Sequence, residues 1–291
     1  MIYLILSILS FTAIVLIFKL FDKYKVHTFH TIVYNYIVAA ILGFYIAGGN
    51  FSITQITQKN WFPNAIIIGI LFISLFYLVA LTAQKVSVAV SIIANKMSVV
   101  IPVIFAFFLY DDSITFLKIS GIILALAGVI LTFRKDKDID IGNKKYIFLP
   151  VVLFIGSGLL DTYIKYSQEY YLQKDELLIF IPCLFAIAAI AGIIIVLSRQ
   201  LLSPEKFYIK NLLWGVLIGL FNYSSVYFLI KTLELERFES SAVFPVNNMG
   251  IVIVATIAAF FLYKEKLSKQ NWIGIILSVI AIAMIAFDPN T

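Results

Sequence analysis

The stretch "FFLYKEKLSKQNWIGIIL", residues 260–277, repeats the pattern of "FFLYDDSITFLKISGIIL", residues 107–124. Both begin with Phe-Phe-Leu-Tyr and end with Gly-Ile-Ile-Leu, and a single offset of 153 residues aligns them without a gap. The same offset matches Asp112 with Glu265 in the turn and, further upstream, Asn95 with Asn248. A register shared over this length predicts that the chain consists of two similar halves.

Long apolar stretches around these segments predict a helical membrane protein. The 291 residues are 62% hydrophobic and only 13% charged, with a mean hydropathy of +1.01, whereas a soluble domain is about a quarter charged. Apolar stretches of roughly 20 residues, the length that crosses a bilayer core of about 30 Å, recur along the whole chain. The ten predicted spans are 2–20, 29–48, 61–83, 86–110, 115–133, 146–167, 176–198, 208–232, 239–263 and 268–287.

A strongly charged segment, 134–145, separates the fifth span from the sixth and predicts a linker between repeats at 1–137 and 138–291. Because five is an odd number, the second half enters the membrane in the orientation opposite to the first. The predicted fold is therefore all-α, a polytopic membrane protein with ten transmembrane helices in two inverted five-helix repeats. Such repeats, meeting near the midplane of the bilayer, are typical of secondary transporters.

The distribution of basic residues predicts an orientation. Apart from Lys96, fifteen Lys and Arg residues lie in the odd-numbered loops and six in the even-numbered loops. Cytoplasmic loops carry the excess of Lys and Arg, so this bias places both termini outside the cytoplasm.

The repeated segments extend over 87–131 and 240–287. Each runs from small and hydroxyl residues through an apolar helix to a short acidic turn and a glycine-containing helix. In this pattern and in its ten spans, the chain resembles the EamA-type transporters of the drug/metabolite transporter superfamily. The glycine of the family's usual Gly-Glu turn is replaced by Asp111 and Lys264. The resemblance implies efflux of metabolites or drugs by alternating access, and it implies cytoplasmic termini, opposite to the basic-residue bias.

Lys96 lies in the middle of the fourth span, with no other charged residue near it in the sequence. A lysine at the centre of a membrane helix costs about 2.5–3.5 kcal/mol, and an intramembrane charge predicts a functional site. A snorkelling or structurally paired lysine is the alternative. Sugar-phosphate translocators, more distant relatives by resemblance, use embedded basic residues for anions. Here the repeat partner of Lys96 is Met249, so the single cation favours a monocarboxylate over a phosphate.

Uncharged polar residues extend this predicted substrate-binding site. Ser91, Asn95 and Ser98 share one helix face, which should point inward because polar groups facing lipid would be unsatisfied. Hydrogen bonding between helices is the alternative role for such residues. The predicted substrate-binding residues are Lys96, Asn95, Asn248, Asn247, Ser91, Ser98, Asn35, Tyr34, Tyr77, Asn222 and Tyr227.

Asp161, near the end of the sixth span, is the candidate proton-coupling residue. Its carboxylate also lies four residues before Lys165, a favourable helix spacing for a surface ion pair. The sequence leaves both roles open.

Prolines and glycines predict local features of the spans. Pro102 and Pro245 lack an N–H, so each is expected to free the carbonyl four residues earlier and to kink its helix. Gly215 and Gly219 form a GxxxG motif, which predicts close helix packing within the chain; a homodimer is the alternative.

Together these features predict a secondary active transporter, an exporter or exchanger, of small metabolites such as amino acids or other carboxylates. The expected location is the cell membrane, and the expected partners are the bilayer, the substrate and a coupling proton. The sequence contains no metal-binding or phosphate-loop motif, so no cofactor, no nucleic acid and no enzymatic activity are expected. An integral membrane enzyme or a non-transporting membrane scaffold is the alternative class.

Overall fold

The computed structural model describes residues 2–48, 52–109, 115–133, 146, 148–173, 176–202, 208–234, 240–265 and 267–286. These residues form α-helices and contain no β-strand. The predicted linker 134–145 and the acidic turn at Asp111 and Asp112 lie outside the described residues. The helices are α1 (Ile2–Tyr24), α2 (Thr28–Ala47), α3 (Ile53–Thr57), α4 (Phe62–Lys85), α5 (Val88–Met97), α6 (Val100–Leu109), α7 (Phe116–Phe133), α8 (Leu149–Tyr171), α9 (Leu177–Leu202), α10 (Ile209–Glu234), α11 (Ser240–Tyr263) and α12 (Lys269–Ala286).

A helix occupies each predicted span, with ends within a few residues of those predicted, but the fourth span is divided between α5 and α6. Seven helical segments of the described chain are long and apolar enough to cross a membrane, and α7 and α12 contain shorter apolar segments. α8 is long, but its second half carries Asp161, Lys165 and Glu169. The all-α membrane fold is confirmed, whereas the count of ten crossings stays a prediction.

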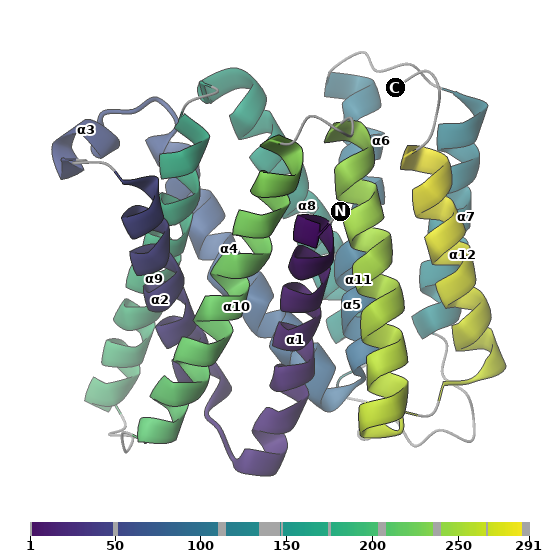
Figure 1. Cartoon of the computed structure of the whole chain (residues 1–291), viewed down its shortest axis with the longest axis horizontal. Coiled ribbons are helices and arrows are strands. Elements are labelled where there is room, and N and C mark those ends of the chain that lie inside the picture. The colour runs from purple at the N-terminus through teal and green to yellow at the C-terminus, as the bar shows by residue number, and fades with distance from the viewer. Residues whose placement is uncertain are drawn as a thin grey trace. The chain divides into compact units, whose positions relative to one another are not determined.

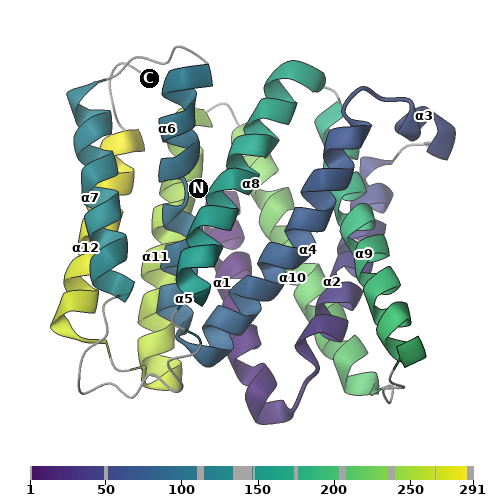
Figure 2. The same ribbon diagram turned by 180° about the vertical axis from the view of Figure 1, so that it is seen from behind.

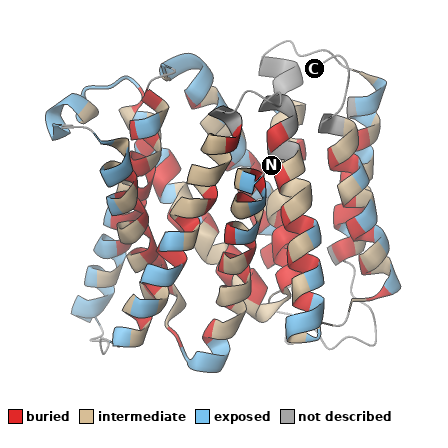
Figure 3. Cartoon of the chain, in the orientation of Figure 1, coloured by how far each residue is buried: buried red, intermediate tan, exposed pale blue. Residues whose placement is uncertain are grey.

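The outward surface of α9 shows how these helices suit a bilayer. Ile190, Ile194, Leu197 and Leu201 are exposed and lie three or four residues apart, so they share one face of the helix. In Figure 3 the first half of α9 is mostly buried, whereas its last ten residues are exposed or half-buried. A continuous exposed apolar face is rare on a soluble monomer but is required where a helix meets lipid.

Helix lengths reproduce the sequence repeat. The bounds of α7, shifted by 153 residues, are those of α12, and both helices contain 18 residues. α1 and α8, the first helices of the two halves, contain 23 residues each. These two pairs of helices therefore match in length between the halves.

The compact units of the fold do not coincide with these halves. Unit 1 consists of Met1–Leu20, Leu78–Leu159 and Ser224–Thr291, and unit 2 consists of Phe21–Tyr77 and Leu160–Tyr223. Each unit thus takes equivalent helices from both repeats: α5 to α7 with α11 and α12 in unit 1, and α2 with α9 in unit 2. The four helices α1, α4, α8 and α10 contribute residues to both units.

In unit 1, α7 and α12 lie side by side (Figure 1, Figure 2). Gly128 and Gly274 permit this approach, because a Cβ on either would lie within 3.0 Å of the backbone carbonyl of the other. Asn271 then donates hydrogen bonds to the carbonyl oxygens of Leu131 and Thr132, at 3.3 and 2.9 Å. Small residues and buried amides commonly join membrane helices in this way.

In unit 2, the GxxxG motif of α10 packs against α2, as predicted for contact within one chain. A Cβ on Gly215 would lie 2.9 Å from the carbonyl oxygen of Thr31, and one on Gly219 would lie 2.8 Å from that of Asn35. α9 lies beside α2 on another side, again in both views (Figure 1, Figure 2). The motif is thus used inside the chain, and a homodimer stays untested.

Candidate functional site

The fourth span is interrupted next to Lys96. α5 ends at Met97 and α6 begins at Val100, whereas the equivalent helix of the second repeat, α11, continues unbroken through Pro245. The expectation that Pro102 frees the carbonyl of Ser98 is wrong, because that oxygen accepts a hydrogen bond from the Ile101 N–H at 2.9 Å. Since Pro102 cannot donate to this carbonyl, the chain tightens into a turn there instead of continuing the helix.

Lys96 lies in the last turn of α5, half-buried. Its Nζ lies 3.8 Å from the centre of the Phe11 ring of α1, within the range of a cation–π interaction. The last carbonyls of a helix carry partial negative charge, so the end of α5 also stabilises a cation at this position. Both contributions lower the cost of keeping an ammonium group inside the membrane.

Asn95, the neighbour of Lys96, connects α5 to α8. Its Nδ2 donates to the Ser157 hydroxyl at 3.0 Å. The next residue, Gly158, packs so tightly on Ile101 of α6 that a Cβ would clash with that side chain. Together these contacts hold both sides of the helix interruption against α8 within unit 1.

Ser91 and Ser98 are fully buried, and their hydroxyls donate to backbone carbonyls. Ser91 bonds to the oxygen of Val79 at 2.9 Å and Ser98 to that of Asn95 at 2.5 Å. Asn95 and Lys96 are the half-buried members of this predicted polar group, so they are the better placed to reach a solute.

Three predicted substrate-binding residues of the second repeat lie in unit 1, on α11 and α10. Asn247 is buried, and its Oδ1 has no hydrogen-bond partner among the described residues, while Asn248 is half-buried. Gly250, on the same face as Asn247, packs directly on Ile8 of α1, three residues before Phe11. Tyr227, at the unit 1 end of α10, lies beside Phe228 at a ring-centre distance of 5.6 Å.

The remaining predicted substrate-binding residues lie in unit 2. Asn222 donates from Nδ2 to the Oδ1 of Asn35 at 3.1 Å, and both side chains are buried beside the GxxxG contact. This geometry favours interhelical bonding for the pair. Tyr34 is half-buried on α2, and Tyr77 packs edge-on against Phe29 at 5.5 Å. Their role in substrate binding stays a prediction.

Asp161 is exposed on α8, and Lys165, one turn further, is exposed on the same face. Tyrosines occupy the next part of the helix, where the rings of Tyr163 and Tyr166 are stacked at 6.1 Å. The Tyr163 hydroxyl donates to Asn64 of α4 at 2.8 Å. Asp161 therefore lies on an open surface of α8 at the start of a polar and aromatic stripe.

Sequence reasoning missed the role of Glu265, which caps α5. Its carboxylate accepts hydrogen bonds from the Ser87 hydroxyl at 2.8 Å and the Val88 N–H at 3.0 Å, with a longer contact of 3.5 Å from the Ala89 N–H. Lys19 of α1 lies 3.3 Å from the same carboxylate. The signal available in the sequence was Ser87, a typical helix N-cap residue, together with the repeated acidic turn.

Phe11 and Ser157 were also missed, because nothing in the sequence marks either one. Phe11 is one of 26 phenylalanines, and serine is common in membrane helices. Their closeness to Lys96 and Asn95 arises only when α1 and α8 pack beside α5.

These features define a multi-pass helical membrane protein built from two repeats, with a charged group inside one span. The model of the EamA-like transporter family matches the chain twice, at residues 1–134 and 144–287. The chain belongs to the EamA-like transporter family, within the drug/metabolite transporter superfamily.

A related sequence and a solved structure each match this chain over nearly its whole length. An uncharacterized protein of Haemophilus influenzae is 25% identical over 284 residues, covering 96% of this chain and 95% of its own length. A solved crystal structure of a protein with 14% sequence identity has a TM-score of 0.56 and covers 96% of this chain and 95% of its own. The structural likeness supports the fold over nearly the whole chain.

Proposed function

We propose that the protein is a secondary active transporter of small metabolites bearing a carboxylate, such as amino acids, and that it works by alternating access as an exporter or exchanger. Membership of a transporter family supports the class. The observation that supports a carboxylate substrate is Lys96, whose ammonium group lies beside an interrupted helix in the middle of a membrane span. Secondary transporters commonly bind solutes where a helix is discontinuous.

The surroundings of Lys96 fit a carboxylate. An ammonium group in a membrane is stabilised by an anion that pairs with it, and the cation–π contact with Phe11 holds the Lys96 Nζ at this position. Asn95 supplies amide groups next to the ammonium. Asn247 of α11 has a buried carbonyl oxygen without a partner among the described residues, an acceptor that suits the ammonium group of an amino acid. With Met249 at the repeat position, the site holds one cation, which suits one negative charge better than two.

Asp161 is proposed as the residue that carries a coupling proton. A carboxylate on an exposed face of α8 is accessible to the protons that a coupled carrier would move. The alternative is a surface pair with Lys165 and no part in transport. A coupling role predicts that proton-driven flux depends on this carboxyl while solute exchange does not.

Counterflow in proteoliposomes tests the function. Purified protein is reconstituted in vesicles loaded with one unlabelled amino acid or small carboxylate at a time, and uptake of the same labelled solute is followed. A transporter accumulates the label transiently and leaves it chemically unchanged. A labelled product of altered mass would instead identify a membrane enzyme. No exchange across a broad panel, with protein that remains folded, would favour a scaffold.

A further inference from the structure

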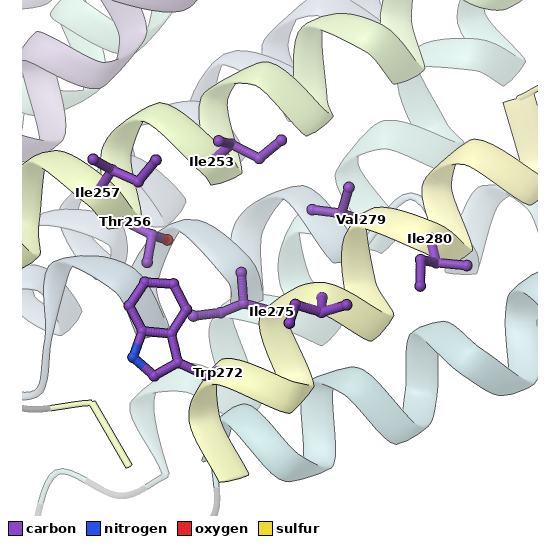
Figure 4. Close-up of a pocket in the computed structure, with 8 residues that line it drawn as sticks. Ile253, Thr256, Ile257, Trp272, Ile275, Val279 and Ile280 are labelled. Atoms are coloured by element: carbon purple, nitrogen blue, oxygen red, sulfur yellow. The ribbon is translucent and has the colours of Figure 1, made fainter. Parts of the chain in front are cut away.

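An apolar groove with a volume of about 250 Å³ lies between α11 and α12 in unit 1. Figure 4 shows its lining, with Ile253, Thr256 and Ile257 on α11 facing residues of α12 from Trp272 to Ile280. The lining side chains are apolar except for Thr256, whose hydroxyl is buried and contributes almost nothing to the surface. The surface of the groove is therefore hydrocarbon almost throughout.

The groove is open along one side. Ile253 and Ile257 are 40% and 44% exposed, and Ile276 and Ile280 are 55% and 43% exposed. In a membrane protein such a surface meets lipid, and its occupant must be apolar. From Trp272 to Ile280 the helix rises about 12 Å, close to the roughly 15 Å depth of one leaflet's hydrocarbon. These dimensions fit a single acyl chain.

One end of the groove carries aromatic and basic residues. Phe260 and Trp272 close it with an edge-to-face contact at 6.2 Å, and tryptophan is typical of the membrane interface. Lys264 and Lys269, which are both exposed, follow at this end. Helical spacing places Lys269 on the face of Trp272 and Ile276, three and seven residues away. Lys264 is the first residue after α11, which ends at Tyr263.

Among the described residues, neither Lys264 nor Lys269 has an acidic neighbour in the sequence that is left to pair with it. Glu265 is the single acidic residue of the sequence between Ser240 and Ala286. Its carboxylate is directed to the first turn of α5 and to Lys19 instead. A groove for one acyl chain therefore ends at two lysines whose nearest acidic neighbour in the sequence is already engaged.

We propose that this groove binds an anionic phospholipid, with one acyl chain between α11 and α12 and the phosphate held by Lys264 and Lys269. A zwitterionic lipid lacks the net charge that the lysines select. Each basic residue near a membrane surface contributes an attraction to anionic lipid, and two together correspond to about a 30-fold preference over a neutral headgroup. This site is separate from the residues around Lys96 and does not depend on the identity of the transported solute.

Native mass spectrometry of the detergent-purified full chain tests the charge requirement. Dioleoyl phosphatidylglycerol and dioleoyl phosphatidylcholine are titrated separately, and bound lipid is counted. The wild type should bind phosphatidylglycerol about 30-fold more tightly. Lys264→Asn with Lys269→Gln should abolish the preference, asparagine being chosen because Lys264 has a φ of 51°. Lys25→Asn with Lys23→Gln is the matched control, since Lys25 has a φ of 50° and both lysines are exposed.

Filling the groove tests the acyl-chain site. Ile276→Trp should weaken binding of both lipids, whereas Ile273→Trp, at an equally exposed position of α12 outside the groove lining, should leave binding unchanged. The proposal is overturned if the double lysine variant keeps its preference, or if the two tryptophan variants behave alike. It is also overturned if glycerol phosphate alone binds as tightly as the lipid, or if Ile276→Trp dissociates a dimer, which would place a second copy of the chain in the groove.

Discussion

Replacing Lys96 with alanine separates a substrate-binding charge from a structural one. The substitution removes the ammonium group and most of the side chain, while alanine favours the helical conformation of α5. Three energies change: the attraction to an anionic substrate, the local contacts of the empty site and the cost of a charge in the membrane.

The loss of substrate affinity should be large. Truncating one partner of a buried charge pair typically costs about 2–5 kcal/mol, because the other charge is left without its partner. At 1.4 kcal/mol for each tenfold change, the dissociation constant of a carboxylate substrate should rise by about 30-fold to several thousand-fold. Lys96→Arg should restore only part of this affinity, since the planar guanidinium has a different shape.

The effect on stability should be small or favourable. The variant loses a cation–π contact with Phe11, formed at 3.8 Å and worth about 0.5–2 kcal/mol. It also loses an interaction with the C-terminal end of α5 worth about 0.3–1 kcal/mol. Against these, it avoids a charge whose insertion at a helix centre costs about 2.5–3.5 kcal/mol. The terms nearly cancel, with a net change toward greater stability.

Binding and thermal unfolding should be measured on the same preparations. Met249→Ala is the matched control, because it truncates a long uncharged side chain at the equivalent position of the other repeat. The control should keep carboxylate affinity within a few-fold of the wild type. If Lys96→Ala unfolds at a clearly lower temperature while its folded fraction binds and exchanges the substrate normally, Lys96 is a structural residue and the reasoning fails.

Four other changes test separate parts of the structure. Glu265→Gln should destabilise the protein by about 1–3 kcal/mol in thermal unfolding, because the first turn of α5 loses a charged acceptor. Gly219→Ala should lower the unfolding temperature, at a cost of about 1–3 kcal/mol, because the new Cβ would lie 2.8 Å from a carbonyl oxygen of α2; an unchanged temperature would contradict that packing. Burial raises the pKa of the Glu176 carboxyl, but its 2.8 Å ion pair with Lys59 and a hydrogen bond from the backbone outweigh burial and hold the pKa below its ordinary value of 4.5. The resulting stabilisation should be complete above that value and lost as the pH falls through the lowered pKa, and Lys59→Gln should reduce this acid sensitivity in unfolding measured across the pH range. Asp161→Asn should abolish proton-driven net flux in proteoliposomes while leaving counterflow intact, and an unchanged pH dependence would leave Asp161 without a coupling role.

The sequence by itself determined the membrane class, the two repeats and the approximate ends of the helices. These are local properties: a run of about 20 apolar residues is stable in a bilayer only as a helix, whatever it packs against. The offset of 153 residues correctly related α7 to α12, because homologous segments keep their length. Lys96 could be singled out for the same reason, since its cost in a membrane depends on its depth in the span.

Only the tertiary structure decided which of these local features act together. Glu265 caps a helix that begins 177 residues before it, and Lys96 meets Phe11 from a different helix. The compact units combine equivalent helices from both repeats instead of following the order of the chain. The fourth span and its counterpart α11 are similar in sequence, yet one is interrupted and the other continuous. Hydropathy specifies that a segment enters the membrane, but in lipid the choice of neighbour depends on close packing and on hydrogen bonds between helices, which pair residues far apart in the chain.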